Sequence, residues 1–443
     1  MPTTPPAAVS FREAFWFWLR LGLISFGGPA GQIAIMHEEL VEKRRWLSEK
    51  RFLHALNFCM VLPGPEAQQL ATYIGWLLHR RLGGLVAGGL FVLPAFLLFL
   101  LLGWLYMVYG QLPAVAAGLY GIRPAVVAIV LAAALRIGNK ALKNGLLWGV
   151  ALASLLAVAV FQVGFPWIVG AAALTGAVGG RLWPQHFVIG GSQSAGAAAA
   201  PALIDDDTPV PEHARFSVSR MLSVLLAALA IWGSVMGLLA ARFGMAASFT
   251  RMGWFFTKAA LLTFGGAYAV LPYVFQGAVV DQHWLTPAQM LDGLALGETT
   301  PGPLLMVLTF VGFVGGWTHG LLLSPLASAL LAATLVTFMT FLPSFVFIFL
   351  GGPLVEASRR ELRLTAPLSA ITAAVVGVIA NLGVFLGRQV FWPTQGFDGV
   401  ALVLALLAFI AIQRFRLGLP VLIAGAALAG WLLHAAGLLA GPG

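Results

Sequence analysis

Charged residues and cysteine are both scarce in this sequence. Asp, Glu, Lys and Arg together make up 9% of the 443 residues, whereas 60% of the residues are apolar. Soluble domains carry about 25% charged residues, so this composition excludes a soluble protein and indicates an integral membrane protein. The single cysteine, Cys59, excludes an intramolecular disulfide, and no spacing of cysteine and histidine resembles a metal site. We therefore expect no bound metal and no other cofactor.

The motifs of the common enzyme classes are also absent. The sequence contains no phosphate-binding Walker loop, no dinucleotide-binding fingerprint and no nucleophile elbow. We therefore predict that the protein is not an enzyme and that an ion gradient or a partner protein supplies its energy. The net charge is +9, but the basic residues are scattered over short loops. That pattern is typical of membrane topology signals and does not favour a nucleic acid partner.

Apolar runs of membrane-spanning length recur from one end of the sequence to the other. Runs of about 17 to 25 residues indicate helices, because the strands of a membrane barrel are about 10 residues long and alternate in polarity. We predict an all-α, multi-pass helix bundle with about 10 to 13 transmembrane helices in the lipid bilayer. The candidate segments are 15–36, 52–78, 82–109, 114–136, 145–161, 163–182, 219–241, 252–275, 288–317, 322–351, 366–387, 398–413 and 418–438.

A polar stretch interrupts the apolar segments. Residues 185–217 contain Gly-Gly-Ser-Gln-Ser-Ala-Gly, an alanine run, three consecutive aspartates and several prolines. The apolar content is too low for independent folding, so this stretch is predicted to be a flexible linker. It separates a first repeat, residues 1–184, from an extra transmembrane helix, residues 218–248, and a second repeat, residues 249–443.

The two repeats align by simple subtraction. From Phe11 and Phe249 to the Pro-Gly-Pro sequences at 63–65 and 301–303, matching residues lie 238 positions apart. Duplication of this kind is the usual ancestry of secondary transporters. Farther along, the offset is 249, and the pairs that define it are Leu93-Pro94 with Leu342-Pro343 and Ala125-Val126-Val127 with Ala374-Val375-Val376.

The two Pro-Gly-Pro sequences lie inside apolar segments and predict broken helices. Proline removes a backbone donor, and lipid offers the freed carbonyl groups no water, so such a break is tolerated only where protein buries it or where it lines a cavity. Paired broken helices in two repeats are the best indication of a transport site that a sequence gives. We therefore expect the substrate site to include Pro63, Gly64, Pro65, Pro301, Gly302 and Pro303.

The distribution of Lys and Arg predicts how the repeats are oriented. In the first repeat basic residues cluster at 43–51, at 80–81 and at 136–143, whereas in the second they mark loops at the other end, 359–363 and 414–416. Cytoplasmic loops are enriched in Lys and Arg, so this pattern predicts repeats that are inverted relative to each other. The number of crossings stays open, because the broken segments either span the membrane or re-enter it.

Polar residues stand beside both breaks. Glu66 and Gln68 follow the first, and the Glu66 carboxylate either caps the next half-helix or carries a coupling proton. Glu298 precedes the second break and has the same two interpretations. Thr299 and Thr300 either offer hydroxyl groups to an oxyanion or cap the broken helix.

Two further features complete the predicted substrate site. The repeated Phe26-Gly27-Gly28 and Phe264-Gly265-Gly266 either allow close helix packing or open the backbone so that its amides face the substrate. Arg123 either holds a tetrahedral oxyanion with its forked guanidinium or extends from a helix end to the membrane surface.

These segments resemble the chromate ion transporter family in its long, two-domain form. The resemblance covers nearly the whole chain outside the linker. The second repeat departs from the first, since Leu304 stands where the first has Glu66, and the repeats are therefore expected to divide the work. The signatures are Phe26-Gly27-Gly28-Pro29, Trp46-Leu47, residues 62–76, Gly83-Gly84, Leu93-Pro94, Arg123-Pro124, Phe264-Gly265-Gly266 and residues 293–303.

The resemblance implies a secondary transporter of the bacterial inner membrane that exports chromate. Sulfate is a second candidate substrate, and the membrane potential or a proton gradient is the driving force. Uptake of sulfate or another small oxyanion is the alternative, because a gradient-coupled carrier is reversible. The missing catalytic groups and the paired broken helices argue against a membrane-embedded enzyme or a structural subunit. The sequence leaves open whether the chain works alone or as a homodimer.

Overall fold

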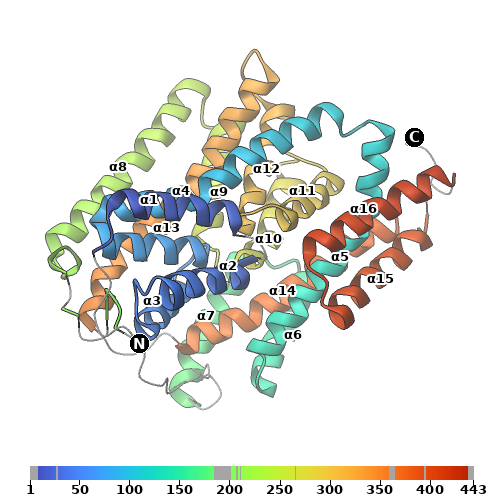
Figure 1. Cartoon of the computed structure of the whole chain (residues 1–443). Coiled ribbons are helices and arrows are strands. Elements are labelled where there is room, and N and C mark those ends of the chain that lie inside the picture. Colours follow the sequence, from blue (N-terminus) through green and yellow to red (C-terminus); the bar gives the residue numbers. More distant parts are fainter. Residues whose placement is uncertain are drawn as a thin grey trace.

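The chain folds almost entirely into helices (Figure 1). A computed structural model describes residues 8–25, 28–183, 201–205, 208–209, 211–264, 266–358, 365–393 and 396–437. The α-helices of these residues are α1 Phe11–Ile24, α2 Gly28–His37, α3 Glu49–Val61, α4 Glu66–Tyr109, α5 Pro113–Ala141, α6 Gly145–Ala159, α7 Phe165–Leu182, α8 Val218–Phe243, α9 Ser248–Leu261, α10 Ala267–Phe275, α11 Pro287–Thr299, α12 Val307–His319, α13 Pro325–Ser358, α14 Thr365–Phe391, α15 Gly399–Phe415 and α16 Leu419–Ala435.

Several of these helices have the length and apolar composition of membrane spans. Among the described residues, five helices qualify by these two criteria, namely α4, α5, α8, α13 and α14. Shorter apolar helices include α6, α15 and α16. The predicted all-α membrane bundle is thus confirmed. Helix α8 lies at the outer edge of the bundle (Figure 1), and only Ala228 and Leu239 of its residues are buried.

Each repeat contains two places where a helix stops and restarts. Helix α1 gives way to α2 after Ser25, and α3 gives way to α4 across Pro63-Gly64-Pro65. In the second repeat α9 gives way to α10 after Thr263, and α11 is separated from the short 3₁₀ helix η5, Leu304–Met306, by Pro301-Gly302-Pro303. The four breaks fall at matching positions, so the duplication extends to the backbone.

The helices that lead into the Pro-Gly-Pro breaks begin in the same way. The Ser48 hydroxyl caps α3 by accepting the Arg51 amide at 3.2 Å. Thr286, 238 positions later, caps α11 by accepting the Gln289 amide at 3.2 Å, and the Gln289 side chain accepts the Thr286 amide in return. These caps satisfy backbone donors that a helix start otherwise leaves without a partner.

The two repeats exchange their last helices. Helices α6 and α7 of the first repeat pack on α14 of the second, and α15 and α16 of the second pack on α5 of the first. Since α14 matches α5 at the offset of 249, the arrangement is reciprocal (Figure 1). Helices α4 and α13, which also match, pack against each other. Neither repeat can therefore bury its apolar surface without the other.

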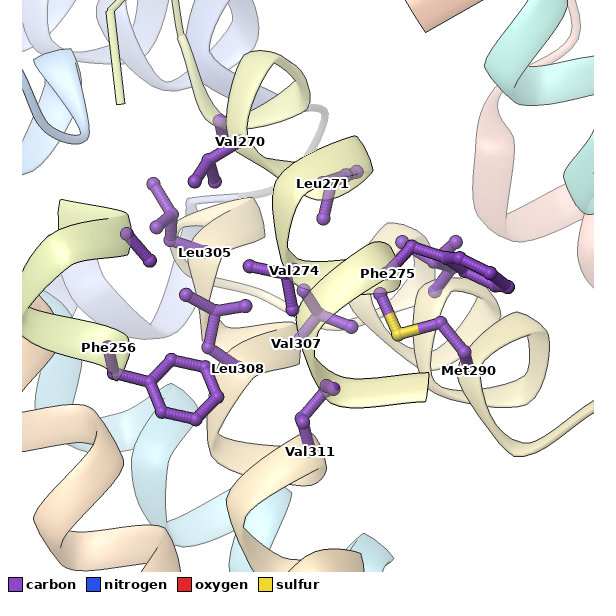
Figure 2. Close-up of a cluster of buried hydrophobic side chains, with 14 of the residues drawn as sticks. Phe256, Val270, Leu271, Val274, Phe275, Met290, Leu305, Val307, Leu308 and Val311 are labelled. Atoms are coloured by element: carbon purple, nitrogen blue, oxygen red, sulfur yellow. The ribbon is translucent and has the colours of Figure 1, made fainter. Parts of the chain in front are cut away.

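The core of the second repeat surrounds its two breaks. Figure 2 shows Phe256 of α9, Val270 of α10, Met290 of α11, Leu305 of η5 and Val311 of α12 meeting in one apolar cluster. All five side chains are buried, and Val270 and Val311 are β-branched. Burial of such side chains holds the short helices in place, because segments this short are not stable alone.

The long helix α4 is not straight. His79 (φ −135°, ψ 37°) and Arg80 (φ 55°, ψ −156°) leave the helical conformation and divide α4 into residues 66–79 and a long second part. This kink coincides with the boundary that the sequence predicted between the apolar segments 52–78 and 82–109. The first part packs against α3, where the Phe58 and Tyr73 rings meet. Both α3 and this part are shorter than the about 20 residues that a membrane-spanning helix needs.

Part of the predicted linker is anchored to the first repeat. Residues 185–200 lie outside the described residues. The Leu203 amide donates to the Arg45 carbonyl at 2.9 Å, and the Ile204 amide donates to the Trp46 carbonyl at 3.0 Å. Ile204 is buried, and so is Ala214 farther along. The few apolar residues of the stretch account for this attachment, which its overall composition did not predict.

Candidate substrate site

Each Pro-Gly-Pro sequence forms a hydrogen bond with the opposite repeat. Its partner there is the break between α1 and α2 or between α9 and α10. The Gly64 amide donates to the Thr263 carbonyl at 2.7 Å, and the Gly302 amide donates to the Ser25 carbonyl at 2.8 Å. Gly302 matches Gly64 and Thr263 matches Ser25, so these are one contact made twice. The breaks thus supply partners for backbone groups that the interrupted helices leave free.

The glycines of these breaks are required by geometry. Gly64 has φ +133° and Gly302 has φ +107°, where other residues are strained. A Cβ atom on Gly64 would lie 2.5 Å from Ser344 Oγ, and one on Gly302 would lie 2.4 Å from Ala95 Cβ. Ala95 and Ser344 match at the offset of 249 and directly follow Pro94 and Pro343. Each break therefore lies against the long helix of the opposite repeat.

Two acidic side chains lie at the junction of the breaks. A Cβ atom on Gly266 would lie 3.6 Å from Glu66 Oε1, so the carboxylate that follows the first Pro-Gly-Pro faces the start of α10. The Tyr268 hydroxyl donates to Glu298 Oε1 at 2.5 Å, which joins α10 to the end of α11. Together with the two amide contacts, these interactions connect all four breaks into one cluster, which we call the break cluster.

Helix starts in the break cluster carry no side-chain cap. Pro65 precedes α4, Gly266 precedes α10 and Pro303 precedes η5, and none of these three provides a capping side chain. The first amides of a helix point out of its start, and the helix dipole places partial positive charge there. Several helix starts that meet in one place favour an anion.

Buried polar atoms without a partner surround the break cluster. The Oε1 atoms of Gln32, Gln68 and Gln69 and the Ser344 hydroxyl are inaccessible to solvent and have no hydrogen-bond partner among the described residues. The nitrogen ends of all three amides are engaged. Gln32 Nε2 donates to the Gly302 carbonyl at 2.6 Å, Gln69 Nε2 to the Pro63 carbonyl at 2.8 Å and Gln68 Nε2 to Thr72 Oγ1 at 3.0 Å. Buried polar atoms are normally satisfied, so this group suits a polar ligand or water.

The structure gives the two threonines a local role. Thr299 Oγ1 donates to the Ala295 carbonyl at 3.0 Å, and Thr300 Oγ1 donates to the Leu296 carbonyl at 2.8 Å. The two hydroxyl protons are therefore used at the end of α11, in line with the capping interpretation that the sequence left open beside the oxyanion one. Of the other predicted residues, Phe26, Gly27 and Gly265 lie outside the described residues, whereas Gly28 starts α2 and Phe264 is partly buried in the main core.

The guanidinium group of Arg123 does not face the break cluster. Its Nε and NH2 groups donate to the two carboxylate oxygens of Asp292 at 2.9 and 3.0 Å, and the Tyr106 hydroxyl donates to the same carboxylate at 2.8 Å. The guanidinium thus holds a fully buried carboxylate of α11. The sequence had left open an oxyanion or the membrane surface as its partner. We call this set the α11 triad.

A second set of one arginine, one carboxylate and one tyrosine joins α3, α4 and α13. Arg51 NH1 of α3 donates to Glu356 Oε2 of α13 at 2.9 Å, and the Tyr73 hydroxyl donates to Glu356 Oε1 at 2.5 Å. Since α3 matches α11 and the end of α13 matches the end of α4, the two sets occupy related places. Each ties a broken helix of one repeat to a long helix of the other.

Comparison with known proteins assigns the chain to a family. The family model described as chromate transporter matches residues 12–177 and again residues 250–431. The chain belongs to the chromate transporter family. The two matched stretches agree with the two repeats and leave out the linker and α8.

Curated relatives match this family member over nearly their whole length. It is 35% identical to a chromate transport protein of Pseudomonas aeruginosa, over 97% of this chain and 94% of that protein. It is 30% identical to a chromate transport protein of Cupriavidus metallidurans, over 96% of this chain and 94% of that protein, and 28% identical to a probable chromate transport protein of Synechococcus elongatus. No solved structure gives a significant match.

Several of the side chains described above were not singled out from the sequence. Gln32, Ser344 and Tyr268 lie at the break cluster, and Asp292 pairs with Arg123. The signal available in the sequence was a polar residue within an apolar segment. Ser344, for example, follows Pro343 where the first repeat has alanine. Within the described part of the chain, no three His, Cys, Asp or Glu side chains lie close enough together to hold a metal ion.

Proposed function

We propose that the protein is a secondary transporter that exports chromate across the bacterial inner membrane, and that the break cluster is its substrate site. The observation that carries this proposal is the reciprocal pair of contacts, Gly64 to Thr263 and Gly302 to Ser25, which joins the four helix breaks in two pairs. The hydrogen bond from Tyr268 to Glu298 connects the two pairs. Broken helices of two repeats form the midplane sites of many secondary transporters. The names of the relatives support chromate as the anion.

The chemistry of the break cluster suits a tetrahedral dianion. Uncapped helix starts supply partial positive charge, and the Ser344 hydroxyl supplies a donor that no described residue uses. Chromate and sulfate share this shape and charge, so sulfate competes for the site. The proposed site also includes Gln68 and the two Pro-Gly-Pro sequences. Arg123 acts as a clamp between the repeats in this proposal, because Asp292 occupies its fork.

Protons drive the export in this proposal. Acidic side chains at membrane depth are the proton carriers of many pumps and transporters. Glu66 faces Gly266 at the break cluster, and Glu298 is bonded to Tyr268 nearby. We assign the coupling proton to Glu66, since no described residue forms a hydrogen bond or ion pair with it. The membrane potential adds about 2.3 kcal/mol per charge per 100 mV in the outward direction for an anion.

The two repeats, residues 1–184 and 249–443, are inverted in this proposal. The basic residues of the first repeat cluster at one end of its helices and those of the second repeat at the other. The additional helix α8 between the repeats supplies a crossing with no counterpart in the first repeat. Inverted repeats that exchange contacts at a shared site give a carrier two related conformations, one open to each side.

Uptake of labelled chromate into everted membrane vesicles tests the proposal. Vesicles from cells with and without the protein are compared, with an uncoupler in one arm and excess sulfate in another. Accumulation that needs the protein, stops with the uncoupler and falls with sulfate supports proton-driven export. Equal accumulation in both kinds of vesicle, with the protein present in the membrane, contradicts it. Accumulation only in right-side-out vesicles assigns the opposite direction, uptake.

A further inference from the structure

A basic pocket lies apart from the break cluster, at the kink of α4. It encloses about 360 Å³ between the kink, the end of α13 and the segment that leads into α8. Its lining contains the four arginines Arg80, Arg81, Arg215 and Arg220. None of the contacts at the break cluster involves these residues, so transport of the substrate does not account for the pocket.

The pocket lies at the ends of membrane-spanning helices. Helix α8 begins at Val218, and the candidate span of α13 ends at Glu356. Arg80 belongs to the kink that divides α4. Three helix ends that meet at one level place the pocket at the boundary between lipid and water. The positive-inside pattern of the sequence puts Arg80 and Arg81 on the cytoplasmic side.

The arginines of the pocket are not neutralised by the described residues. No described Asp or Glu forms an ion pair with any of them. Arg220 NH1 donates to the carbonyls of Glu212 and His213 at 2.9 and 3.0 Å, and Arg81 NH2 approaches Ser223 Oγ at 3.4 Å. These contacts orient two guanidinium groups with neutral atoms only, which leaves their positive charge available to an anion.

A neighbouring histidine reports the positive field. His213 Nε2 lies 3.0 Å from the Trp76 carbonyl and its side chain is partly buried beside the pocket. Burial lowers the pKa of His213, and the positive charges of Arg80 and Arg220 lower it further. A pocket that disfavours the protonated, positively charged form of His213 favours an anion.

Most of the remaining wall of the pocket is apolar. Its polar members are His79, His213 and Ser217, and its apolar members are Trp76, Leu82, Phe216, Met221, Phe349, Leu350 and Pro353. A free inorganic anion gains nothing from such a wall, because it is fully hydrated in water. A molecule with an anionic group joined to an apolar chain fits both parts of the lining. Basic pockets between spanning helices on the cytoplasmic side are typical headgroup sites.

We propose that this pocket binds the phosphate group of an anionic phospholipid of the surrounding bilayer. The phosphate lies against the arginines, and the glycerol and upper acyl chain lie against Phe349 and Pro353. A lipid held there connects the α4 kink, α13 and the start of α8. Since the first part of α4 carries Glu66, the lipid stabilises the segment that positions the coupling carboxylate.

Binding of short-chain lipids to the purified full-length protein in detergent tests the proposal. The probes are short-chain phosphatidylglycerol, phosphatidylcholine of the same chain length, and inorganic phosphate. We expect phosphatidylglycerol to bind at least about tenfold more tightly than either of the others. Inorganic phosphate binding as tightly as phosphatidylglycerol would overturn the lipid assignment, and equal binding of the two lipids would overturn the role of the arginines.

Paired variants locate the binding. Arg80→Gln with Arg215→Gln removes two arginines for which no side-chain hydrogen bond is seen among the described residues, so the fold should be retained. Arg242→Gln with Arg251→Gln removes the same charge at the opposite end of α8 and the start of α9. We expect the first pair to weaken phosphatidylglycerol binding about tenfold or more and the second to leave it within about twofold. Equal effects of the two pairs would contradict the assignment.

Discussion

Arg123 and Asp292 form a two-pronged ion pair between the repeats. Two nitrogens of one guanidinium meet the two oxygens of one carboxylate at 2.9 and 3.0 Å. Asp292 is fully buried, whereas about a third of the Arg123 side chain is exposed. A buried carboxylate is tolerated only with partners of this quality, so the pair fixes α11 against α5.

Loss of this pair should destabilise the protein without changing how it recognises its substrate. Asp292→Asn leaves the guanidinium without its counter-charge and should lower stability by on the order of 3 kcal/mol. Arg123→Lys keeps the charge but loses the fork, and should slow turnover while the apparent KM for chromate stays within about twofold. Thermal unfolding in detergent and transport kinetics measure the two effects, and Asp281→Asn, an exposed carboxylate, is the control. A rise in KM of tenfold for Arg123→Lys would make Arg123 an anion ligand after all.

The glycines of the two breaks should resist substitution. Gly64→Ala and Gly302→Ala each place a methyl group within 2.5 Å of a neighbouring side-chain atom and strain a backbone with positive φ. Each change should cost about 2 to 4 kcal/mol of stability and abolish most transport. Gly89→Ala on α4 is the matched control, because nothing lies within 4 Å of the added methyl group. Wild-type thermal stability in Gly64→Ala would show that the break is less tightly packed than described.

The sequence predicted which residues would have equal roles but not which would touch. The offset of 238 pairs Ser25 with Thr263 and Gly64 with Gly302, and the structure gives each pair the same kind of contact. The contacts cross between the repeats, however, and a repeat pattern is equally consistent with contacts inside each one. Only the folded arrangement of the two repeats decides between these.

The ion pairs were hidden from sequence reasoning for a related reason. Arg51 and Glu356 are 305 residues apart, and Arg123 and Asp292 are 169 apart, so no local spacing connects them. Arg123 also appeared free to bind an oxyanion because its partner stands on a helix predicted only as part of segment 288–317. The helix breaks were predictable because Pro-Gly-Pro acts locally, through backbone chemistry alone.

Ser344 should contribute to substrate affinity more than to stability. Its hydroxyl is buried beside Gly64 and has no partner among the described residues. Ser344→Ala should therefore raise the apparent KM for chromate about tenfold, as expected for a hydrogen bond to a charged ligand, with an unchanged unfolding temperature. Ser154→Ala on α6 is the control, because that hydroxyl already donates to the Val150 carbonyl at 2.8 Å. A KM equal to that of the wild type would remove Ser344 from the substrate site.

Acid should loosen the segment around His213. Burial, together with Arg80 and Arg220, lowers the pKa of His213 below its usual value of 6.5 in the folded state. The unfolded state therefore binds the proton more readily, and the contribution of His213 to stability is present above pH 6.5 and lost as pH falls below it. Thermal unfolding of wild type and His213→Gln between pH 8 and pH 5 measures this. The wild type should lose stability faster than the variant on acidification, and parallel curves would contradict the assignment.

The most direct test of the central claim is transport by Glu66→Gln in proteoliposomes. An imposed pH gradient, acidic inside, drives uptake of labelled chromate in one assay, and exchange of chromate across the membrane without a gradient is measured in another. Glu13→Gln, an exposed carboxylate of α1, is the control. If Glu66 couples proton movement to chromate at the break cluster, the variant loses gradient-driven uptake by tenfold or more and keeps exchange. Gradient-driven uptake at the wild-type rate would contradict the account.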